Sequence, residues 1–349
     1  MSDLHFPERP VTRSRARMAA LALLAVALCG AFAACASAPG ASSGNTKAQH
    51  VTLGLTFIPN IPFAPFYVAQ ELGYYRDAGL DVTLRHHGFT EGEFDALQAG
   101  HEDMIFAGGD ETLQARAKGI PLTFVATVYT KYPVTLIIPA SSPIHSLKDL
   151  KGRTVGVPGQ FGATYIGLLA LLQSAGLKTS DIHIQSIGFT QVPALLGHKV
   201  DAAMGYVNNE AVQLQKAGFA IRTFPVADVK PLISNGLAAP QAYLDQHPDI
   251  VRAVVKATLR GLEYTLAHPD SALDLSKRDV PGLDDPKKAA DARAVLDATL
   301  PVWQIAGGKP GFNDAAEWKG MADFLLAQGQ LAKPVDVTKA YSNAYLPSS

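Results

Sequence analysis

Aromatic and amide side chains recur in the segments that follow the expected strands of this chain, and both kinds of residue can hold a flat ring. Aromatic faces stacked on a planar ring contribute about 1 kcal/mol each beyond area burial. Amide groups read ring nitrogens through directional hydrogen bonds. Any single aromatic residue is more often part of a core, but their number in both halves of the chain favours a flat aromatic ligand. The candidate binding residues are Asn60, Phe63, Phe66, Tyr67, Gly109, Asp110, Glu111, Tyr129, Tyr132, Phe161, Gly162, Thr164, Tyr165, Phe189, Gln191, Tyr206, Asn208 and Asn209.

Glycines open two of the expected helices, at Gly109 and Gly162. Backbone N–H groups at a helix start favour negative charge, although an ordinary turn with Asp110 as the helix N-cap explains the first case equally well. Neither site has the Gly-Lys-Ser/Thr sequence of a phosphate loop, which argues against a triphosphate ligand. Asp110 or Glu111 is suited to pair with an amino group on the ligand ring.

These candidates need a scaffold, and the chain alternates expected strands and helices from Val51 to Val128 and again from Val134 to Phe224. Such alternation is typical of mostly parallel sheets covered by helices. In open α/β sheets ligands bind beyond the carboxyl ends of the strands, where the candidate residues lie. The expected strands are 51–57, 80–85, 103–107, 122–128, 134–138, 154–157, 182–187, 201–206 and 219–224. The expected helices are 63–74, 91–99, 110–118, 146–150, 163–175, 191–196, 208–217, 241–266, 286–300 and 313–328.

The helices after Pro240 come without new strands, so they are expected to pack on the first α/β unit. We therefore predict an α/β fold with two lobes, in which residues 50–132 with 226–349 form lobe 1 and residues 133–225 form lobe 2. A chain that crosses twice between lobes favours a hinge that closes around a ligand.

The N-terminus has the features of an export signal. Four arginines precede an apolar run from Met18 to Ala34, as in a secretory signal peptide. A membrane anchor is the alternative, but the run is short for a membrane span of roughly 20 residues. The segment from Phe32 to Cys35 resembles the lipobox of bacterial lipoproteins, apart from Phe32 in the place of the usual leucine. We predict cleavage after residues 1–34 and lipid attachment at Cys35, with the protein held at the outer face of the cell membrane or in the periplasm.

Composition limits the remaining classes of protein. The 349 residues are 48% hydrophobic, enough for a large core, and the small, Ser/Gly/Pro-rich residues 35–49 suit a flexible tether. Cys29 and Cys35 are the only cysteines, so cleavage leaves a single thiol for lipidation and no disulfide. The net charge of -1 and the scattered Lys and Arg residues argue against nucleic acid as a partner.

Several segments together resemble the periplasmic-type substrate-binding proteins related to thiamine-pyrimidine synthase, which include sulfonate-binding members. The resemblance covers nearly all of the chain from Val51 onward, and the matching segments are 57–60, 66–69, 73–75, 147–157 and 200–202. It implies a type II periplasmic-binding-protein fold and a role as the solute-binding component of an ABC importer. The implied partners are a membrane permease with its ATPase, a small heterocyclic ligand, and the membrane through the lipid on Cys35.

Two segments of lobe 2 indicate the class of ligand. Phe161–Tyr165 and Gly188–Gln191 look most like the branches that bind pyrimidines and riboflavin, so a thiamine pyrimidine precursor is expected first and riboflavin close behind. An alkanesulfonate or nitrate receptor is a further alternative, as is a ligand-sensing partner of a membrane receptor.

An enzyme of thiamine biosynthesis is the main rival class. The eukaryotic synthases of the family use a cysteine-rich iron motif, which a mature chain with one cysteine cannot form. His86, His87 and His101 come nearest to a metal cluster, but they lack the i, i+4 spacing of a helical metal site and are interpreted as solvated loop histidines. No Gly-x-Ser-x-Gly nucleophile motif occurs. We therefore predict a binding protein with no metal or cofactor rather than an enzyme.

Overall fold

The computed structural model describes residues 48–88, 91–92, 94–304 and 308–348. The predicted signal peptide, the lipidated Cys35 and the tether up to residue 47 lie outside the described residues. The predicted tether extends one residue too far, because Gln49 is already the first residue of strand β1 (Gln49–Leu55). Across the described ranges, no helix has both the length and the apolar character needed to cross a bilayer.

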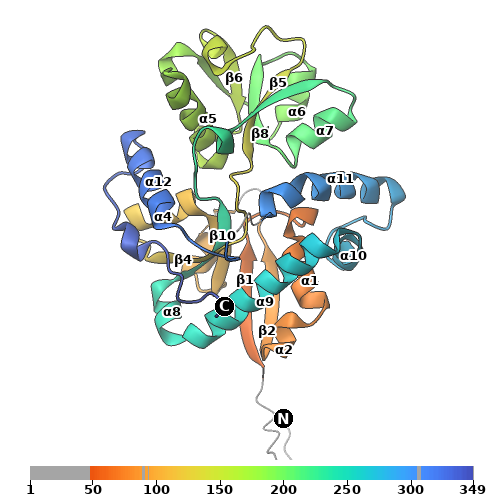
Figure 1. Ribbon diagram of the computed structural model, residues 1–349, viewed down its shortest axis with the longest axis vertical. Coiled ribbons are helices and arrows are strands. Elements are labelled where there is room, and N and C mark those ends of the chain that lie inside the picture. Colours follow the sequence, from red (N-terminus) through yellow and green to blue (C-terminus); the bar gives the residue numbers. More distant parts are fainter. Residues whose placement is uncertain (1–47, 89–90, 93, 305–307, 349) are drawn as a thin grey trace, which may run out of the picture. The chain divides into compact units, whose positions relative to one another are not determined.

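Sheet 1 has five strands in the order β2-β1-β3-β10-β4 (Figure 1). The other strands are β2 (Leu80–His86), β3 (Met104–Gly108), β4 (Leu122–Thr127) and β10 (Asn235–Pro240). β1 pairs in parallel with β2 and β3, whereas β10 lies antiparallel between β3 and β4. All strands except β10 therefore run in the same direction.

Sheet 2 repeats this arrangement in the order β7-β6-β8-β5-β9. Its strands are β5 (Val134–Pro139), β6 (Thr154–Val157), β7 (His183–Ser186), β8 (Ala202–Tyr206) and β9 (Ile221–Pro225). Here β5 is the reversed strand, antiparallel to both β8 and β9. In each sheet the reversed strand is the first one that the chain forms after it arrives from the other sheet. The prediction of an α/β fold with mostly parallel sheets is confirmed.

Two segments connect the sheets, and we call residues 128–133 the first crossing segment and residues 226–234 the second. The second leads into β10, which the sequence analysis missed. The β10 sequence Asn-Gly-Leu-Ala-Ala-Pro contains no β-branched or aromatic residue, so its strand propensity is low. It forms a strand because β3 and β4 offer hydrogen-bonding partners on both sides.

Most expected helices form, with several differences at their ends. The helices are α1 (Ala64–Glu71), α2 (Tyr74–Asp77), α3 (Asp95–Gln98), α4 (Gly109–Ala117), α5 (Gly162–Ala175), α6 (Gln191–Leu196), α7 (Glu210–Lys216), α8 (Gln241–Gln246), α9 (Pro248–Ala267), α10 (Pro269–Leu275), α11 (Pro286–Trp303) and α12 (Ala315–Ala327). The expected helix 63–74 ends early because Gly73 is left-handed, with φ 74°. The expected helix 241–266 is two helices because Pro248 starts a new one. Helix α10 was not predicted.

Helices cover both faces of sheet 1. One apolar cluster joins α1, α9 and α11 to the sheet, and another joins α4 and α12 to it and continues into α5 of sheet 2. Helices α1 and α9 pack so closely that a Cβ on Gly261 would lie 2.1 Å from the carbonyl oxygen of Pro65. This packing fixes α1, which follows the loop after β1 at the edge of the sheet that is expected to bind ligand.

Candidate ligand-binding site

Residues from the carboxyl edges of both sheets meet around two carboxyl groups. Asp110 and Glu111 stand at the start of α4 after β3, Tyr132 lies in the first crossing segment, and Tyr206 ends β8. The Tyr132 hydroxyl lies 3.4 Å from Asp110 Oδ2. Burial, followed by the nearby charges of Glu111 and Asp110, raises the pKa of Tyr206. We call these four residues, together with Glu210, the acid–tyrosine cluster.

Asp110 is the most strongly perturbed acid of this cluster. Its residue is 1% exposed, and burial together with the charge of Glu111 raises the pKa of Asp110 to about 8. The sequence alternative that Asp110 caps α4 is wrong, because Gly108 is the N-cap. The backbone N–H of Gly108 instead donates to Glu111 Oε2 over 2.7 Å. The Asp110 carboxyl accepts from backbone N–H groups at the start of α4 and from the Tyr132 hydroxyl.

Gly109 has a packing function. Its N–H donates to the Ser234 carbonyl oxygen over 3.1 Å, so in this structure that N–H is directed at the second crossing segment. A Cβ at Gly109 would lie 2.4 Å from Ile233 Cγ2. The glycine is therefore required for the close approach of α4 and the second crossing segment.

The aromatic candidates near sheet 1 form a continuous buried wall. The ring centroids of Phe63 and Phe106 are 5.8 Å apart, those of Phe106 and Tyr129 also 5.8 Å, and those of Tyr129 and Trp303 5.9 Å. Phe66 packs on Phe106 with its centroid at 5.2 Å. Phe66 is completely buried, and so is the neighbouring Tyr67, whose hydroxyl lies 3.0 Å from His86 Nε2. The structure places this group beneath the edge of the sheet rather than on an open surface.

Sheet 2 presents its candidates differently. Phe161 follows β6 and is 65% exposed, and Phe189 follows β7 and is 64% exposed. Tyr165 and Thr164 turn into the core along α5, and Gln191 is buried at the start of α6. The φ of Gly162, the first residue of α5, is +68°.

The three asparagine candidates all bind protein groups through their side chains. Asn60 Oδ1 accepts from the N–H of Ile61 over 2.8 Å. Asn209 Nδ2 donates to Glu210 Oε1 over 3.0 Å. Asn208 is buried and donates through Nδ2 to Thr299 Oγ1 of α11 over 2.9 Å, which connects the turn after β8 with a helix that packs on sheet 1.

Sequence reasoning missed Phe106, Trp303, Thr299 and Glu210. Phe106 and Glu210 had a usable signal, since one lies near the end of an expected strand and the other adjoins Asn209. Trp303 and Thr299 had none, because α11 is far from β4 and β8 in the sequence.

The charges of the acid–tyrosine cluster are all acidic. Among the described residues, Asp110, Glu111 and Glu210 have no Lys or Arg partner within hydrogen-bond or ion-pair distance. Glu210 is buried, accepts from the Tyr206 N–H over 2.8 Å, and has a pKa raised by burial. An anionic ligand placed here would meet like charge without compensation. The cluster is suited to a neutral or hydrogen-bond-donating group.

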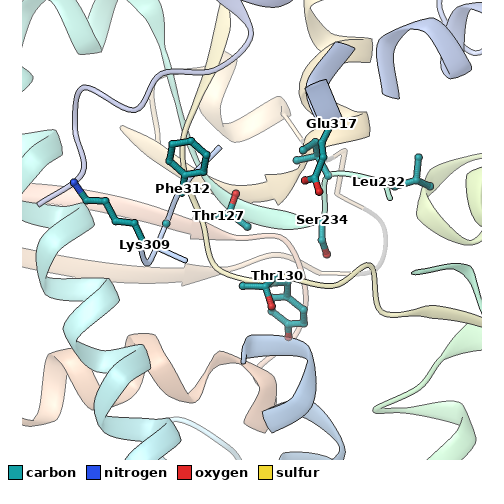
Figure 2. A pocket seen from close by; sticks show the side chains of 10 residues that line it. Thr127, Thr130, Leu232, Ser234, Lys309, Phe312 and Glu317 are labelled. Carbon is teal, nitrogen blue, oxygen red and sulfur yellow. The ribbon is translucent and has the colours of Figure 1, made fainter. Parts of the chain in front are cut away.

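A small pocket lies beside the two crossing segments and has a volume of about 90 Å³. Its walls include Tyr129, Ser234, Phe312 and Glu317, and Figure 2 shows Lys309 extending away from Glu317. Pockets for drug-sized ligands occupy about 300–1,000 Å³. This space is too small for a fused-ring heterocycle.

A wider groove of about 430 Å³ is lined by Gln70, Tyr75, Arg76, Leu80 and Asp81. It lies where β2 begins, at the amino edge of the parallel strands, whereas ligands bind at the carboxyl edge. We therefore assign the candidate site to the acid–tyrosine cluster.

The structure also corrects the sequence interpretation of one histidine. His87 is not a solvated loop residue, because it is 3% exposed and its Nε2 lies 2.7 Å from Glu102 Oε1. The same oxygen accepts from Arg85 Nη1 over 2.7 Å, and Arg85 Nη2 bonds Glu91. This network ties β2 to the segment before β3. Within the part of the chain that is described, no group of three or more His, Cys, Asp or Glu side chains is arranged to hold a metal ion.

Comparisons with known proteins agree with the fold. Residues 60–272 match the family described as NMT1/THI5 like. The chain is 38% identical to the riboflavin-binding protein RibY of Chloroflexus aurantiacus, over 90% of this chain and 91% of that protein. It is 27% identical to the formylaminopyrimidine-binding protein of Halalkalibacterium halodurans, over 86% of this chain and 92% of that protein.

A pyrimidine phosphate synthase and a solved binding protein are also similar. The 4-amino-5-hydroxymethyl-2-methylpyrimidine phosphate synthase of Legionella pneumophila is 26% identical over 86% of this chain and 93% of its own length. The periplasmic aliphatic sulphonate-binding protein SsuA of Escherichia coli superimposes with a TM-score of 0.67 and 17% identity, over 83% of this chain and 91% of that one. The chain therefore has the fold of periplasmic binding proteins.

Proposed function

The chain belongs to the NMT1/THI5-like family, and we propose that it is an exported solute-binding protein that captures riboflavin or a closely related flat heterocycle between the carboxyl edges of its two sheets. The observation that carries this proposal is the 38% identity to a riboflavin-binding protein over nine-tenths of the chain. It reverses the order expected from the sequence, in which a thiamine pyrimidine precursor came first.

The chemistry of the candidate site supports a neutral, flat ligand. Phe161 and Phe189 are exposed in the loops after β6 and β7, which are adjacent parallel strands. An exposed aromatic ring beside the carboxyl edge of a sheet can stack on a flat ligand. The acid–tyrosine cluster supplies polar groups for one edge of that ligand, and its carboxyl groups disfavour a sulfonate. The likeness to the sulphonate-binding protein therefore extends to the fold only.

Export and transport complete the proposal. The basic and apolar N-terminus directs the chain out of the cytoplasm, and Cys35 anchors it by lipid. The two crossing segments act as a hinge, and the loaded protein delivers its ligand to an ABC permease and its ATPase. Catalysis is not part of the proposal: the likeness to pyrimidine phosphate synthases is weaker, at 26% identity, and Cys29 and Cys35 are the only cysteines of the chain.

The test measures ligand binding by the full-length chain purified in detergent. Riboflavin, a formylaminopyrimidine and an alkanesulfonate are compared by thermal shift, and quenching of flavin fluorescence gives the Kd for riboflavin. A ligand at 100 times its Kd stabilises the native state by about 2.7 kcal/mol. We expect riboflavin to raise the Tm and the sulfonate to leave it unchanged. A rise with the sulfonate alone would refute the proposal.

A further inference from the structure

Helix α11 packs in the apolar cluster of sheet 1 and also reaches sheet 2. Asn208, in the turn after β8, donates through Nδ2 to Thr299 Oγ1 of α11 over 2.9 Å. Lys216, at the end of α7, pairs with Asp291 nearer the start of α11. The order of these contacts is reversed along the two segments, so the turn with α7 runs antiparallel to α11. Residues 291 and 299 lie about 12 Å apart along a helix axis, so the two contacts form a seam, which we call the α7–α11 seam.

The contact between Asn208 and Thr299 is the buried part of the α7–α11 seam. Asn208 is 4% exposed and Thr299 is completely buried. Thr299 Oγ1 donates its one hydrogen to the Val295 carbonyl oxygen over 2.6 Å, so it meets Asn208 as an acceptor. Val207, the residue before Asn208, packs against the cluster of sheet 1. A buried amide left without a partner is costly, whereas the solvent-accessible ion pair of the seam contributes little.

The C-terminal end of α11 holds the first crossing segment. The N–H groups of Thr130 and Lys131 both donate to the Val302 carbonyl oxygen, over 2.9 and 3.2 Å. The Thr130 hydroxyl also donates to the Gln304 carbonyl oxygen over 2.8 Å. The last carbonyl groups of a helix have no partner within it, so these bonds fix the crossing segment to the helix end. Helix α11 therefore contacts sheet 1, the proposed hinge and sheet 2, and a rotation about the crossing segments acts on the α7–α11 seam.

A ligand that contacts the acid–tyrosine cluster must separate the edges of the two sheets. Asp110 and Tyr132 are 1% and 4% exposed, so almost no solvent reaches them in the present arrangement. Tyr206 approaches them from the end of β8, and it stands two positions before Asn208 in the chain. A movement that withdraws Tyr206 from the start of α4 therefore carries Asn208 with it. The bond between Asn208 and Thr299 is broken when the sheets separate.

We propose that the bond between Asn208 and Thr299 is a latch that holds the two sheets in their closed arrangement and slows the release of the ligand. Asn208 acts on the ligand through Thr299, and not by touching it. This replaces the sequence interpretation of Asn208 as a ligand contact. The part that concerns release rests on the proposed function, whereas the latch itself is tested on the ligand-free protein.

The ligand-free test uses Trp303, which is completely buried and lies on the same face of α11 as Thr299. Trp318 is the only other tryptophan of the chain, so the substitution W318F in every variant leaves Trp303 as the sole tryptophan. Acrylamide quenching of its fluorescence is measured on the full-length chain in detergent for W318F alone and with N208A, T299V or T299S. T299V keeps the shape of the side chain and removes the hydroxyl, whereas the control T299S keeps the hydroxyl.

We expect the quenching constant to rise at least about twofold with N208A and with T299V, because the open form gains population and exposes Trp303. With T299S it stays at the value of W318F alone. Equal constants in all four proteins would overturn the inference.

The second test measures the release of riboflavin after rapid dilution, by the recovery of flavin fluorescence, in proteins that keep both tryptophans. We expect T299V to raise the dissociation rate constant roughly 3- to 10-fold, as for one lost hydrogen bond. N208A is expected to raise it by the same factor. The double variant N208A/T299V releases riboflavin no faster than either single variant, because the two residues form one bond. T299S keeps the wild-type rate constant.

The pattern of results separates the latch from the proposed function. If N208A speeds the release of riboflavin and T299V does not, Asn208 touches the ligand, so the inference fails and the proposed function stands. If the wild type binds no flavin, the proposed function fails, and the quenching of Trp303 decides the latch by itself. A higher quenching constant with T299V than with T299S then supports the latch, and equal constants overturn it.

Discussion

Replacement of Asp110 by asparagine is expected to change how the stability of the protein depends on pH. The unfolded carboxyl has a pKa of about 3.9, whereas burial and Glu111 raise the pKa of the folded group to about 8. Between these values the folded state holds a proton that the unfolded state has released. The free energy of unfolding therefore falls as pH rises through this window, by about 1.4 kcal/mol per pH unit. This contribution is complete below pH 4 and lost above pH 8.

The change in unfolding free energy between two pH values depends on the number of protons released on unfolding, and not on how far the pKa of Asp110 is shifted. From pH 5 to pH 7 the wild type is expected to lose about 2.7 kcal/mol more than D110N, provided that the folded pKa stays above 7. Other acids, such as the buried Glu210 and the half-buried Asp279, also have raised pKa values, but they are present in both proteins and cancel in the difference.

The assay is urea unfolding of both proteins in the same detergent at pH 5, 6 and 7, with ΔG taken by linear extrapolation. The m-values must agree between the two proteins, because a change in m would indicate a different unfolded or native state. Parallel ΔG curves for wild type and D110N across this range would refute the reasoning, since they would mean that Asp110 is ionised in the folded protein at pH 5.

Three further predictions concern packing, ligand contact and buried charge. G109A is expected to lower the free energy of unfolding in urea by about 1–3 kcal/mol, because its Cβ would overlap the second crossing segment. The control G320A, in α12, places a Cβ where nothing lies within 4 Å and is expected to raise the free energy of unfolding by about 0.4–1 kcal/mol. Equal effects of the two substitutions would contradict the packing argument. F161A is expected to weaken riboflavin binding about 2- to 10-fold in a fluorescence titration, as for one lost aromatic contact, with no change in Tm. The control is F312A, because Phe312 is 51% exposed beside the small pocket, and this variant is expected to keep wild-type affinity. E102A is expected to lower the free energy of unfolding by about 3–5 kcal/mol, because it leaves Arg85 and a buried His87 without their shared acceptor; a loss below 1 kcal/mol would show that the network is not structural.

The position of the site could be predicted only in part from the sequence. The strand ends near Gly109, Phe161 and Tyr206 were located correctly, and the ends of parallel strands are where ligands bind. What each side chain does there could not be read from its type. Phe66 and Phe161 are both aromatic candidates near strand ends, yet Phe66, inside α1, is completely buried, whereas Phe161, just before α5, is 65% exposed.

The sequence by itself determined the α/β class, because apolar strands and capped helices alternate along the chain and these local patterns carry their own periodicity. It also determined that the described part of the chain is held without a disulfide, since residues 48–348 contain no cysteine. Only the tertiary structure decided the place of β10, whose low strand propensity is overcome by β3 and β4 on its two sides. The burial that raises the pKa of Asp110 also depends on residues far apart in the chain, because Tyr132 of the first crossing segment and Ile233 of the second both pack at the start of α4. Burial and charge at one atom depend on every element packed around it, which is why a sequence pattern indicates where such a site lies but not its protonation.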